Sequence, residues 1–440
     1  MSLSTRIVQR HFGQKNGELL IGGTPVTQLA EQHGTPLFVY DRGVLKEKLE
    51  LLRASLPSRF DVYYSIKANP NQSILEFFLS QGCGLEVASG GEFYQALAAG
   101  CDADRVLFAG PGKTPAELEY ALGEGIGEIH LESLQEIDSL AAIARRLGRR
   151  ARVAIRVNPA AEAQGGAMRM GGTASPFGID EETLDSVLER VLQEDHFAFS
   201  GIHLFTGTQI LDHDVLLRQY RRGLEIAARA AGRAGKPLNT MDFGGGLGIP
   251  YFDGDQELNT EAFKETLFPL IEEYGKRPEF DGTRFVVEPG RFLVGESGVY
   301  VTRVLSVKES RGKSFIVVDG GMNHHLAASG NLGQVIKRNF PTAILNKLES
   351  QADHTANVVG PLCTPLDTLA RDAAFPKPEV GDLVGILQSG AYARTSSPLG
   401  FLSHPAPPEI MVHGGQVDLI RRRGEYRELL GDQGEPNGRA

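Results

Sequence analysis

The stretch Asp61-Val-Tyr-Tyr-Ser-Ile-Lys-Ala-Asn-Pro-Asn-Gln72 decides the fold and introduces the first chemically informative side chain. Residues 63–66 have the composition of a buried strand, and the Asn69-Pro70-Asn71 turn signal follows soon after. Lys67 therefore stands at the carboxyl end of an inner strand. Either it extends its ammonium group into water along an apolar stem, or it is a desolvated amine that forms a Schiff base with an aldehyde cofactor.

Short apolar runs alternate with helical stretches on both sides of this segment. The expected strands lie at 63–66, 84–87, 105–108, 128–131, 153–157, 197–204, 240–243 and 284–287. The expected helices lie at 44–56, 73–81, 91–99, 115–123, 134–147, 181–194, 213–231 and 260–274. Helical crossovers connect parallel strands, so residues 41–287 are predicted to form an α/β fold, a closed (β/α)8 TIM barrel, rather than an open sheet.

The pattern changes after residue 287 to short β-rich runs without regular helices. These runs lie at 299–307, 314–319, 356–359, 383–387, 409–413 and 416–421. We expect a C-terminal antiparallel β domain over residues 288–425, joined by the N-terminal segment 1–40. The polar segment 426–440 is expected to be a flexible tail.

Composition restricts the class of protein. With 440 residues, 41% hydrophobic and 23% charged, the chain has the composition of a globular protein. Its net charge of −10 gives no reason to expect nucleic acid or an anionic membrane as a partner. The three cysteines are too few and too scattered for a disulfide framework or a zinc site, so we predict no metal site. Three scattered cysteines are typical of a protein in a reducing compartment, and the N-terminal residues lack the apolar run of a secretory signal. Both features predict a cytoplasmic protein.

Chemistry in a barrel lies at the carboxyl ends of the strands, and several informative side chains are expected there. They are Glu86, Arg156, His203, Thr208, Gly244, Gly245, Gly246 and Glu288. The glycines form either a backbone nest for a phosphate group, to which Thr208 could add a hydroxyl, or a tight turn without a ligand. His203 is either part of the site or a core histidine.

Glu288 is the second informative charge. It could hydrogen-bond a pyridine nitrogen and so make a bound ring a better electron sink, or it could form a salt bridge with Arg291 or Arg156. A lysine, a phosphate nest and a carboxylate at one barrel mouth together suggest pyridoxal phosphate as cofactor.

Five motifs in order carry a resemblance that extends from about residue 18 to 425. They are Tyr64-Ser-Ile-Lys-Ala-Asn, Ser89-Gly-Gly-Glu, Gly244-Gly-Gly-Leu-Gly, Glu288-Pro-Gly-Arg and Gly390-Ala-Tyr. With them the chain resembles the fold-type III pyridoxal phosphate decarboxylases that act on ornithine, arginine and diaminopimelate. The resemblance implies an alanine-racemase-like barrel with a β domain, and a head-to-tail homodimer whose active sites are shared between subunits.

The resemblance also assigns roles to individual residues. It implies that Lys67 carries the cofactor as an aldimine, that Glu288 pairs with the pyridine nitrogen, and that Cys363 from the partner subunit returns the proton after CO₂ leaves. The phosphate is expected to be held by Gly244, Gly245, Gly246, Gly290, Arg291 and Tyr392. Cys83 and Cys101 are expected to be small hydrophobes of the barrel.

The departures from the family pattern concern the substrate. Ornithine and diaminopimelate decarboxylases have an acidic residue after the cysteine that meets a distal ammonium, and here that residue is Thr364. Asp367, four positions past the cysteine, is the alternative acid at a different place. Arg338 is available for a distal carboxylate, but the tyrosine that accompanies it in the family is missing. Phe205 takes the position of the histidine that stacks on the cofactor ring.

A narrower likeness connects these departures. Phe108-Ala-Gly-Pro-Gly-Lys-Thr, His203-Leu-Phe-Thr-Gly-Thr-Gln and Asp319-Gly-Gly-Met-Asn-His-His resemble a biosynthetic branch typified by the butirosin-pathway decarboxylase of L-glutamyl-acyl carrier protein. It implies a modified or carrier-bound amino acid as substrate, in secondary metabolite biosynthesis. His324 and His325 either line the longer substrate channel or cap a loop. A diaminopimelate decarboxylase, a non-catalytic cofactor-binding homologue and a racemase are the alternatives.

Overall fold

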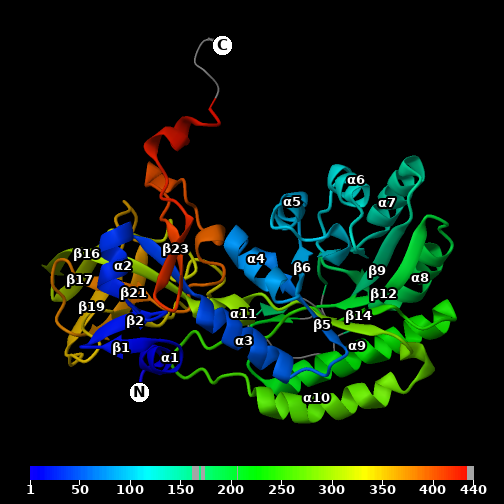
Figure 1. The fold of residues 1–440 in the computed structure, drawn as a ribbon, viewed down its shortest axis with the longest axis horizontal. Coiled ribbons are helices and arrows are strands. Elements are labelled where there is room, and N and C mark those ends of the chain that lie inside the picture. The colour runs from blue at the N-terminus through cyan, green and yellow to red at the C-terminus, as the bar shows by residue number, and fades with distance from the viewer. Residues whose placement is uncertain (161–167, 170–173, 206, 434–440) are drawn as a thin grey trace. The chain divides into compact units, whose positions relative to one another are not determined.

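The computed structural model describes residues 1–160, 168–169, 174–205 and 207–433. The chain divides into two compact units (Figure 1). Unit 1 contains residues 1–47, 250–255 and 294–440, and unit 2 contains residues 48–249 and 256–293. In the expected tail, a short 3-10 turn, η8, spans Tyr426–Leu430, whereas residues 434–440 lie outside the described part of the chain.

Unit 2 is built on a closed parallel barrel, as the sequence predicted. In the described residues its eight strands are β5 (Phe60–Ser65), β6 (Gly84–Val87), β7 (Val106–Phe108), β8 (Glu128–Leu131), β9 (Ala151–Asn158), β12 (Phe197–Leu204), β14 (Thr240–Asp242) and β15 (Arg284–Val287). Each strand pairs with the next in this order, and β15 pairs with β5 to close the barrel. A two-residue strand, β11 (Ile179–Asp180), adds to β9.

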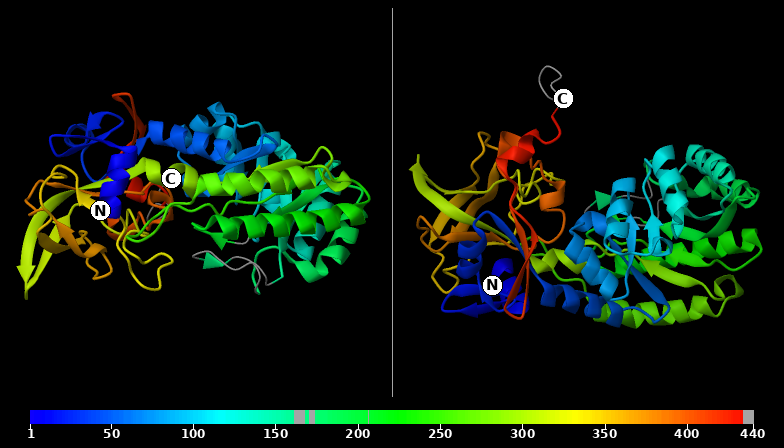
Figure 2. Two further views of the ribbon diagram at one scale, coloured as in Figure 1. Left: turned by 90° about the horizontal axis from the view of Figure 1, so that it is seen from below. Right: turned by 45° about the horizontal axis from the view of Figure 1, so that its top comes forward.

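Helices separate the barrel strands and lie on the outside of the barrel in Figure 1 and in both views of Figure 2. They are α3 (Arg42–Ala54), α4 (Gln72–Ser80), α5 (Gly90–Ala98), α6 (Pro115–Glu124), α7 (Leu134–Leu147), α8 (Leu184–Leu192), α9 (His213–Ala234) and α10 (Thr260–Gly275). Local sequence explains their ends. Thr114 and Glu117 form a capping box at the start of α6, and Gly148, in the left-handed conformation, ends α7.

The short barrel strands are buried on both faces. Every residue of β6, β7, β8 and β14 is buried, because helices cover the outside and side chains of neighbouring strands fill the inside. This burial explains why the sequence shows continuous apolar runs rather than alternation. The acidic and histidine side chains within these runs therefore lie in the barrel interior or against the helices.

Unit 1 contains a second sheet, in the order β20-β19-β17-β16-β4-β22-β23. Its strands are β4 (Leu37–Asp41), β16 (Gly298–Ser310), β17 (Lys313–Val318), β19 (His354–Val359), β20 (Thr368–Phe375), β22 (Glu409–His413) and β23 (Gln416–Arg421). Off this path, β21 (Leu383–Ile386) pairs with β16 and with β18 (Thr342–Ile344). The pairing is mainly antiparallel, as expected, but β17–β19 and β4–β22 are parallel.

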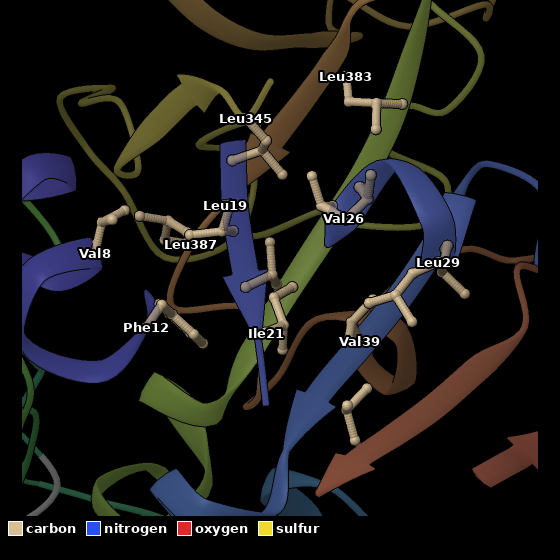
Figure 3. Close-up of a cluster of buried hydrophobic side chains, with 14 of the residues drawn as sticks. Val8, Phe12, Leu19, Ile21, Val26, Leu29, Val39, Leu345, Leu383 and Leu387 are labelled. Carbon is tan, nitrogen blue, oxygen red and sulfur yellow. The ribbon is translucent and has the colours of Figure 1, made fainter. Parts of the chain in front are cut away.

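Apolar residues from distant parts of the chain form the core of unit 1. Figure 3 shows Leu19, Ile21 and Val39 from the N-terminal segment against Leu345 and Leu383. The helices α1 (Leu3–His11) and α2 (Val26–His33) and the strands β1 (Gly13–Lys15), β2 (Glu18–Ile21) and β3 (Thr24–Pro25) complete this end of the chain. None of the helices in the described residues has the length and apolar character needed to cross a membrane.

Candidate active site

Lys67 lies just beyond the carboxyl end of β5. The strand ends at Ser65, one residue earlier than expected, and residues Ile66–Ala68 form the 3-10 turn η1. Lys67 Nζ contacts the two carboxylate oxygens of Glu86 at 2.8 and 2.6 Å, and Ser65 Oγ donates to the same carboxylate. The side chain of Glu86 is 1% exposed and that of Lys67 is 42% exposed. The lysine is therefore ion-paired and partly exposed, a state between the two that the sequence left open.

The glycine loop after β14 is tied to Glu288. The N–H of Gly244 donates to Asp242 Oδ1 at 2.7 Å, and the carbonyl of Gly244 accepts the N–H of Glu288 at 2.7 Å. A Cβ on Gly245 would lie 2.6 Å from the carbonyl oxygen of Glu288. Gly244 and Gly246 have φ angles of +65° and +95°, which side chains disfavour. Glycine is therefore required here by close packing and by backbone conformation.

The glycine loop offers free backbone donors. Within the described part of the chain, the N–H groups of Gly245 and Gly246 donate to no partner. Thr208, in β13 (Gly207–Thr208), precedes Ile210, whose N–H donates to the Gly246 carbonyl at 2.9 Å. Successive unpaired N–H groups form a nest suited to an anion. This favours the phosphate interpretation of the loop over the tight turn.

Three other predicted residues border the same region. Gly290 packs against the end of β5, since a Cβ there would lie 2.9 Å from Ala68 Cβ and 3.2 Å from the Ser65 carbonyl oxygen. Arg291 follows it as the first residue of α11 (Arg291–Val294). The ring of Phe205 packs over the glycine loop, 2.9 Å from the place that a Cβ of Gly244 would take.

Arg156 does not pair with Glu288 in this structure. Its Nη1 lies 2.8 Å from Oε1 of the buried Glu132, which also accepts the N–H of Gly178 at 3.1 Å through its second oxygen. The guanidinium lies over the ring of Phe205, 5.8 Å from its centroid. Arg156 therefore supports the wall of the site through Glu132 and Phe205.

Four buried side chains gather beneath these residues inside the barrel. His130, His203 and Asp242 come from β8, β12 and β14, and Glu288 follows β15. Their ligand atoms all lie within 4.8 Å of one another. His203 Nε2 is 3.4 Å from Glu288 Oε2, and the rings of His130 and His203 are 4.4 Å apart at their centroids. Glu288 Oε1 is buried and has no hydrogen-bond partner in the structure.

The charges in this cluster are unequal. Burial lowers the pKa of His203 to about 4, which keeps its ring neutral. Burial, and then the negative charge of Glu288, raises the pKa of Asp242 well above its usual value. Burial also opposes ionisation of Glu288, but the nearby histidines outweigh it and lower the pKa of this carboxyl. Asp242 is thus the protonated member of the pair and Glu288 the ionised one.

The same spacing would suit a metal ion, which the sequence did not predict. A shared proton accounts for two adjoining buried carboxyl groups without an ion, because Asp242 stays neutral beside the charged Glu288. Asp242 and His130 were not among the residues predicted from the sequence. A charged residue within the short apolar run 240–243, and a histidine within 128–131, were the available signals.

Unit 1 contains Cys363, Thr364 and Asp367 in one loop. Cys363 is exposed. Asp367 is 2% exposed, and its oxygens accept the backbone N–H groups of Met322 at 2.6 Å and Leu362 at 2.9 Å. The carboxylate of Asp367 is therefore already used by the backbone, which argues against its replacing the missing acid at position 364.

The other predicted substrate and cofactor residues of unit 1 have different environments. Arg338 is exposed and stacks on Phe252, with its guanidinium 3.7 Å from the ring centroid. His324 and His325 are buried, and they contact Tyr300 Oη and Ser389 Oγ, each at 3.0 Å. Their contacts are those of a packed interior. Tyr392 is half-buried and has a positive φ of 52°.

Comparison with known proteins identifies the family. A family model described as the pyridoxal binding domain of the pyridoxal-dependent decarboxylases matches residues 42–295. The chain belongs to this family. It is 37% identical over 411 residues to the L-glutamyl-[BtrI acyl-carrier protein] decarboxylase of Niallia circulans, covering 93% of this chain and 96% of the relative. It is 33% identical over 429 residues to diaminopimelate decarboxylase of Zymomonas mobilis, covering 96% and 98%.

Solved structures agree with the decarboxylase fold. The diaminopimelate decarboxylase of M. jannaschi superposes with a TM-score of 0.89 at 25% identity, covering 97% of this chain and 98% of that chain. AQ1208 of Aquifex aeolicus superposes with a TM-score of 0.85 at 30% identity, covering 97% of this chain and 98% of that chain. The protein is thus a pyridoxal phosphate-dependent decarboxylase of the ornithine, arginine and diaminopimelate group.

The residues of unit 2 fit the cofactor of this decarboxylase family. The unpaired N–H groups of Gly245 and Gly246 suit its phosphate, and the buried, unpaired Glu288 Oε1 suits its ring nitrogen. Lys67 supplies an amine at a strand end of the same barrel. A side chain at position 245 would clash with the backbone carbonyl of Glu288. The individual roles of these residues remain predictions.

Proposed function

We propose that this decarboxylase acts on an L-amino acid whose distal end is acylated, as in an L-glutamyl group carried by an acyl carrier protein. The supporting observation is the pair of residues Thr364 and Asp367. Thr364 offers a neutral hydroxyl where the related enzymes that bind a distal ammonium have an acid, and the carboxylate of Asp367 is used by two backbone N–H groups. A substrate without a distal ammonium requires neither acid.

Different residues of the chain are proposed to hold the cofactor, to stabilise its ring and to bind its phosphate. Bound pyridoxal phosphate supplies an electron sink for the electron pair left when the carboxyl group departs as CO₂. Lys67 holds the cofactor and Glu288 stabilises the protonated ring. Loss of one preorganised hydrogen-bond donor from an enzyme active site costs about 3 kcal/mol, and we expect a contribution of similar size from Glu288. Gly244, Gly245, Gly246, Gly290, Arg291, Thr208 and Tyr392 are proposed to bind the phosphate.

Cys363 is proposed to return the proton to the carbon that lost the carboxyl group. Its thiol is exposed, and we propose that it reaches the site of the other copy in a homodimer. Mixing Cys363→Ala protein with Lys67→Ala protein should then restore part of the activity that each lacks alone. Two variants that remain inactive after mixing and subunit exchange would contradict the shared site.

The substrate is tested by CO₂ release from a panel of free and carrier-linked amino acids. Glutamyl-acyl carrier protein should be turned over at least tenfold faster than free glutamate, ornithine, arginine or diaminopimelate. Comparable turnover of diaminopimelate would favour the second candidate, a diaminopimelate decarboxylase. The 33% identity to enzymes of that name and the exposed guanidinium of Arg338, which lies 3.9 Å from Asp255 and could exchange that contact for a distal carboxylate, are the observations in its favour.

Cofactor binding is tested separately from turnover. The purified protein should show an absorbance band that borohydride removes, and Lys67→Ala should lack it. A protein with the band but without activity on any member of the panel would favour the non-catalytic homologue. Cys363→Ala should keep the band and lose most of the turnover.

A further inference from the structure

Water can approach the barrel interior from the end opposite Lys67. A cavity of about 420 Å³ lies at the amino ends of the strands. Its walls include the exposed Asp61, Arg152 and Arg284, so it is open to solvent, and also the buried Glu128 and Thr240. A polar cavity of this size holds several water molecules. Glu128 is thus in reach of water although its side chain belongs to the barrel interior.

Glu128 begins a line of titratable groups that ends at Glu288. His130 Nε2 lies 3.2 Å from Glu128 Oε1 on one side and 3.9 Å from Asp242 Oδ2 on the other. Asp242 in turn adjoins Glu288, since the ligand atoms of the two carboxyl groups lie within 4.8 Å of each other. All four side chains are buried, so the line passes through the barrel rather than over its surface.

Each member of this line can carry a proton. Burial opposes ionisation of Glu128, but hydrogen bonding by His130 outweighs it and lowers the pKa of Glu128, whereas the pKa of Asp242 is raised. The other groups that interact electrostatically with members of the line include Lys67, Arg156, His203, Tyr220, Tyr63 and Arg284. Arg156 pairs with Glu132, and Lys67 pairs with Glu86 at the other end of the barrel.

We propose that Glu128, His130 and Asp242 form a proton path from the amino-end cavity to Glu288. A proton from water binds Glu128, passes to His130 Nε2 and then to Asp242 Oδ2, while the proton already on Asp242 moves to Glu288. One proton enters at Glu128 and one proton arrives at Glu288, and Glu128, His130 and Asp242 return to their starting charges. The path thus controls whether Glu288 is protonated, and it does not pass through the barrel mouth that holds Lys67.

This inference gives His130 and Asp242 the role of positioning residues that act through Glu288. It depends on the proposed role of Glu288 for its catalytic meaning, but the exchange of a buried proton can be measured without turnover. The direct readout is the infrared carbonyl band of the protonated carboxyl group of Asp242 in the cofactor-loaded protein. Asp242→Asn should remove this band and so assign it.

The test is the rate at which the band shifts after transfer to D₂O. In the wild-type protein the shift should be fast, and it should stay fast after borohydride fixes the cofactor on Lys67 and fills the mouth. His130→Phe should slow the shift at least tenfold. Glu128→Gln, which keeps a hydrogen-bonding partner for His130 but cannot carry a proton, should slow it similarly. His196→Phe, which replaces a histidine outside the line, is the matched control and should exchange as the wild type does.

Three results would overturn the path. One is equal exchange in the wild type, His130→Phe and Glu128→Gln. Another is wild-type exchange that becomes tenfold slower once the mouth is filled, because the proton would then enter beside Lys67. The third is a stoichiometric divalent metal in the purified protein that is lost in Asp242→Asn, since an ion would occupy the place of the shared proton. The substrate panel has no influence on these outcomes.

Discussion

Asp367 Oδ2 accepts the N–H of Leu362 at 2.9 Å, immediately before Cys363 in the chain. The second oxygen of Asp367 accepts the N–H of Met322 at 2.6 Å. One buried carboxylate therefore joins the cysteine loop to the segment that follows β17. The position of the exposed thiol depends on an interaction that is itself hidden from solvent.

Asp367→Ala should weaken this loop strongly. Two buried N–H groups would lose their acceptor, at a cost of roughly 2–4 kcal/mol in the free energy of unfolding. Urea denaturation measures this loss. Asp367→Asn retains one acceptor oxygen and should cost less while lowering turnover, with cofactor absorbance unchanged. A wild-type free energy of unfolding for Asp367→Ala would contradict the role of the carboxylate.

Gly245→Ala should impair cofactor binding. The new Cβ would lie 2.6 Å from the carbonyl oxygen of Glu288, so the loop must move away from the strand end. We expect at least a tenfold weaker cofactor affinity, measured by titration of the cofactor-free protein. Gly123→Ala is the matched control because nothing lies within 4 Å of its Cβ position in α6. It should leave the affinity unchanged and stabilise the helix by about 0.5–1 kcal/mol.

Thr364→Glu should change substrate preference. A carboxylate at this position provides a partner for a distal ammonium, so CO₂ release from free diamino acids should rise at least tenfold relative to the carrier-linked substrate. Thr364→Gln has nearly the same size without the charge and serves as the control. The explanation by charge fails if the two variants give the same preference.

His325 should make stability depend on pH. Burial lowers its pKa to about 3 from the ordinary 6.5, so the ring is neutral in the folded protein where the unfolded chain binds a proton. Stability is therefore complete above pH 6.5 and is lost as the pH falls toward 3. From pH 6.5 to about pH 5 this group should cost about 2 kcal/mol. Denaturation at the two pH values should show a smaller loss in His325→Gln, whereas the exposed His413→Gln should behave as wild type.

The barrel was predictable because most residues of each strand are buried and a helix separates each strand from the next. The strands at 84–87, 128–131, 197–204 and 284–287 were predicted with their observed bounds. β20 was missed because Ala-Arg-Asp-Ala-Ala in its middle lacks β-branched residues. β18 and α1 were also missed.

The candidate site was only partly predictable for a geometric reason. Strand ends with unusual residues, such as Lys67 and Glu288, stand out in the sequence. Side chains along a strand alternate between the barrel axis and the outside, and the closure of the sheet decides which set faces the axis. The cluster of His130 with Asp242 therefore could not be predicted from a single strand. The use of Asp367 by backbone N–H groups likewise depends on a residue 45 positions away.

The position of β4 in the sheet of unit 1 has a consequence for synthesis of the chain on the ribosome. β4 ends at Asp41, but its neighbours β16 and β22 begin at Gly298 and Glu409. The barrel residues emerge between them and can close first, whereas one edge of β4 waits for β16 and the other waits for β22, near the end of the chain. During that interval Leu37, Phe38 and Val39 present an unpaired apolar strand, and this segment is where a nascent chain most needs protection from aggregation.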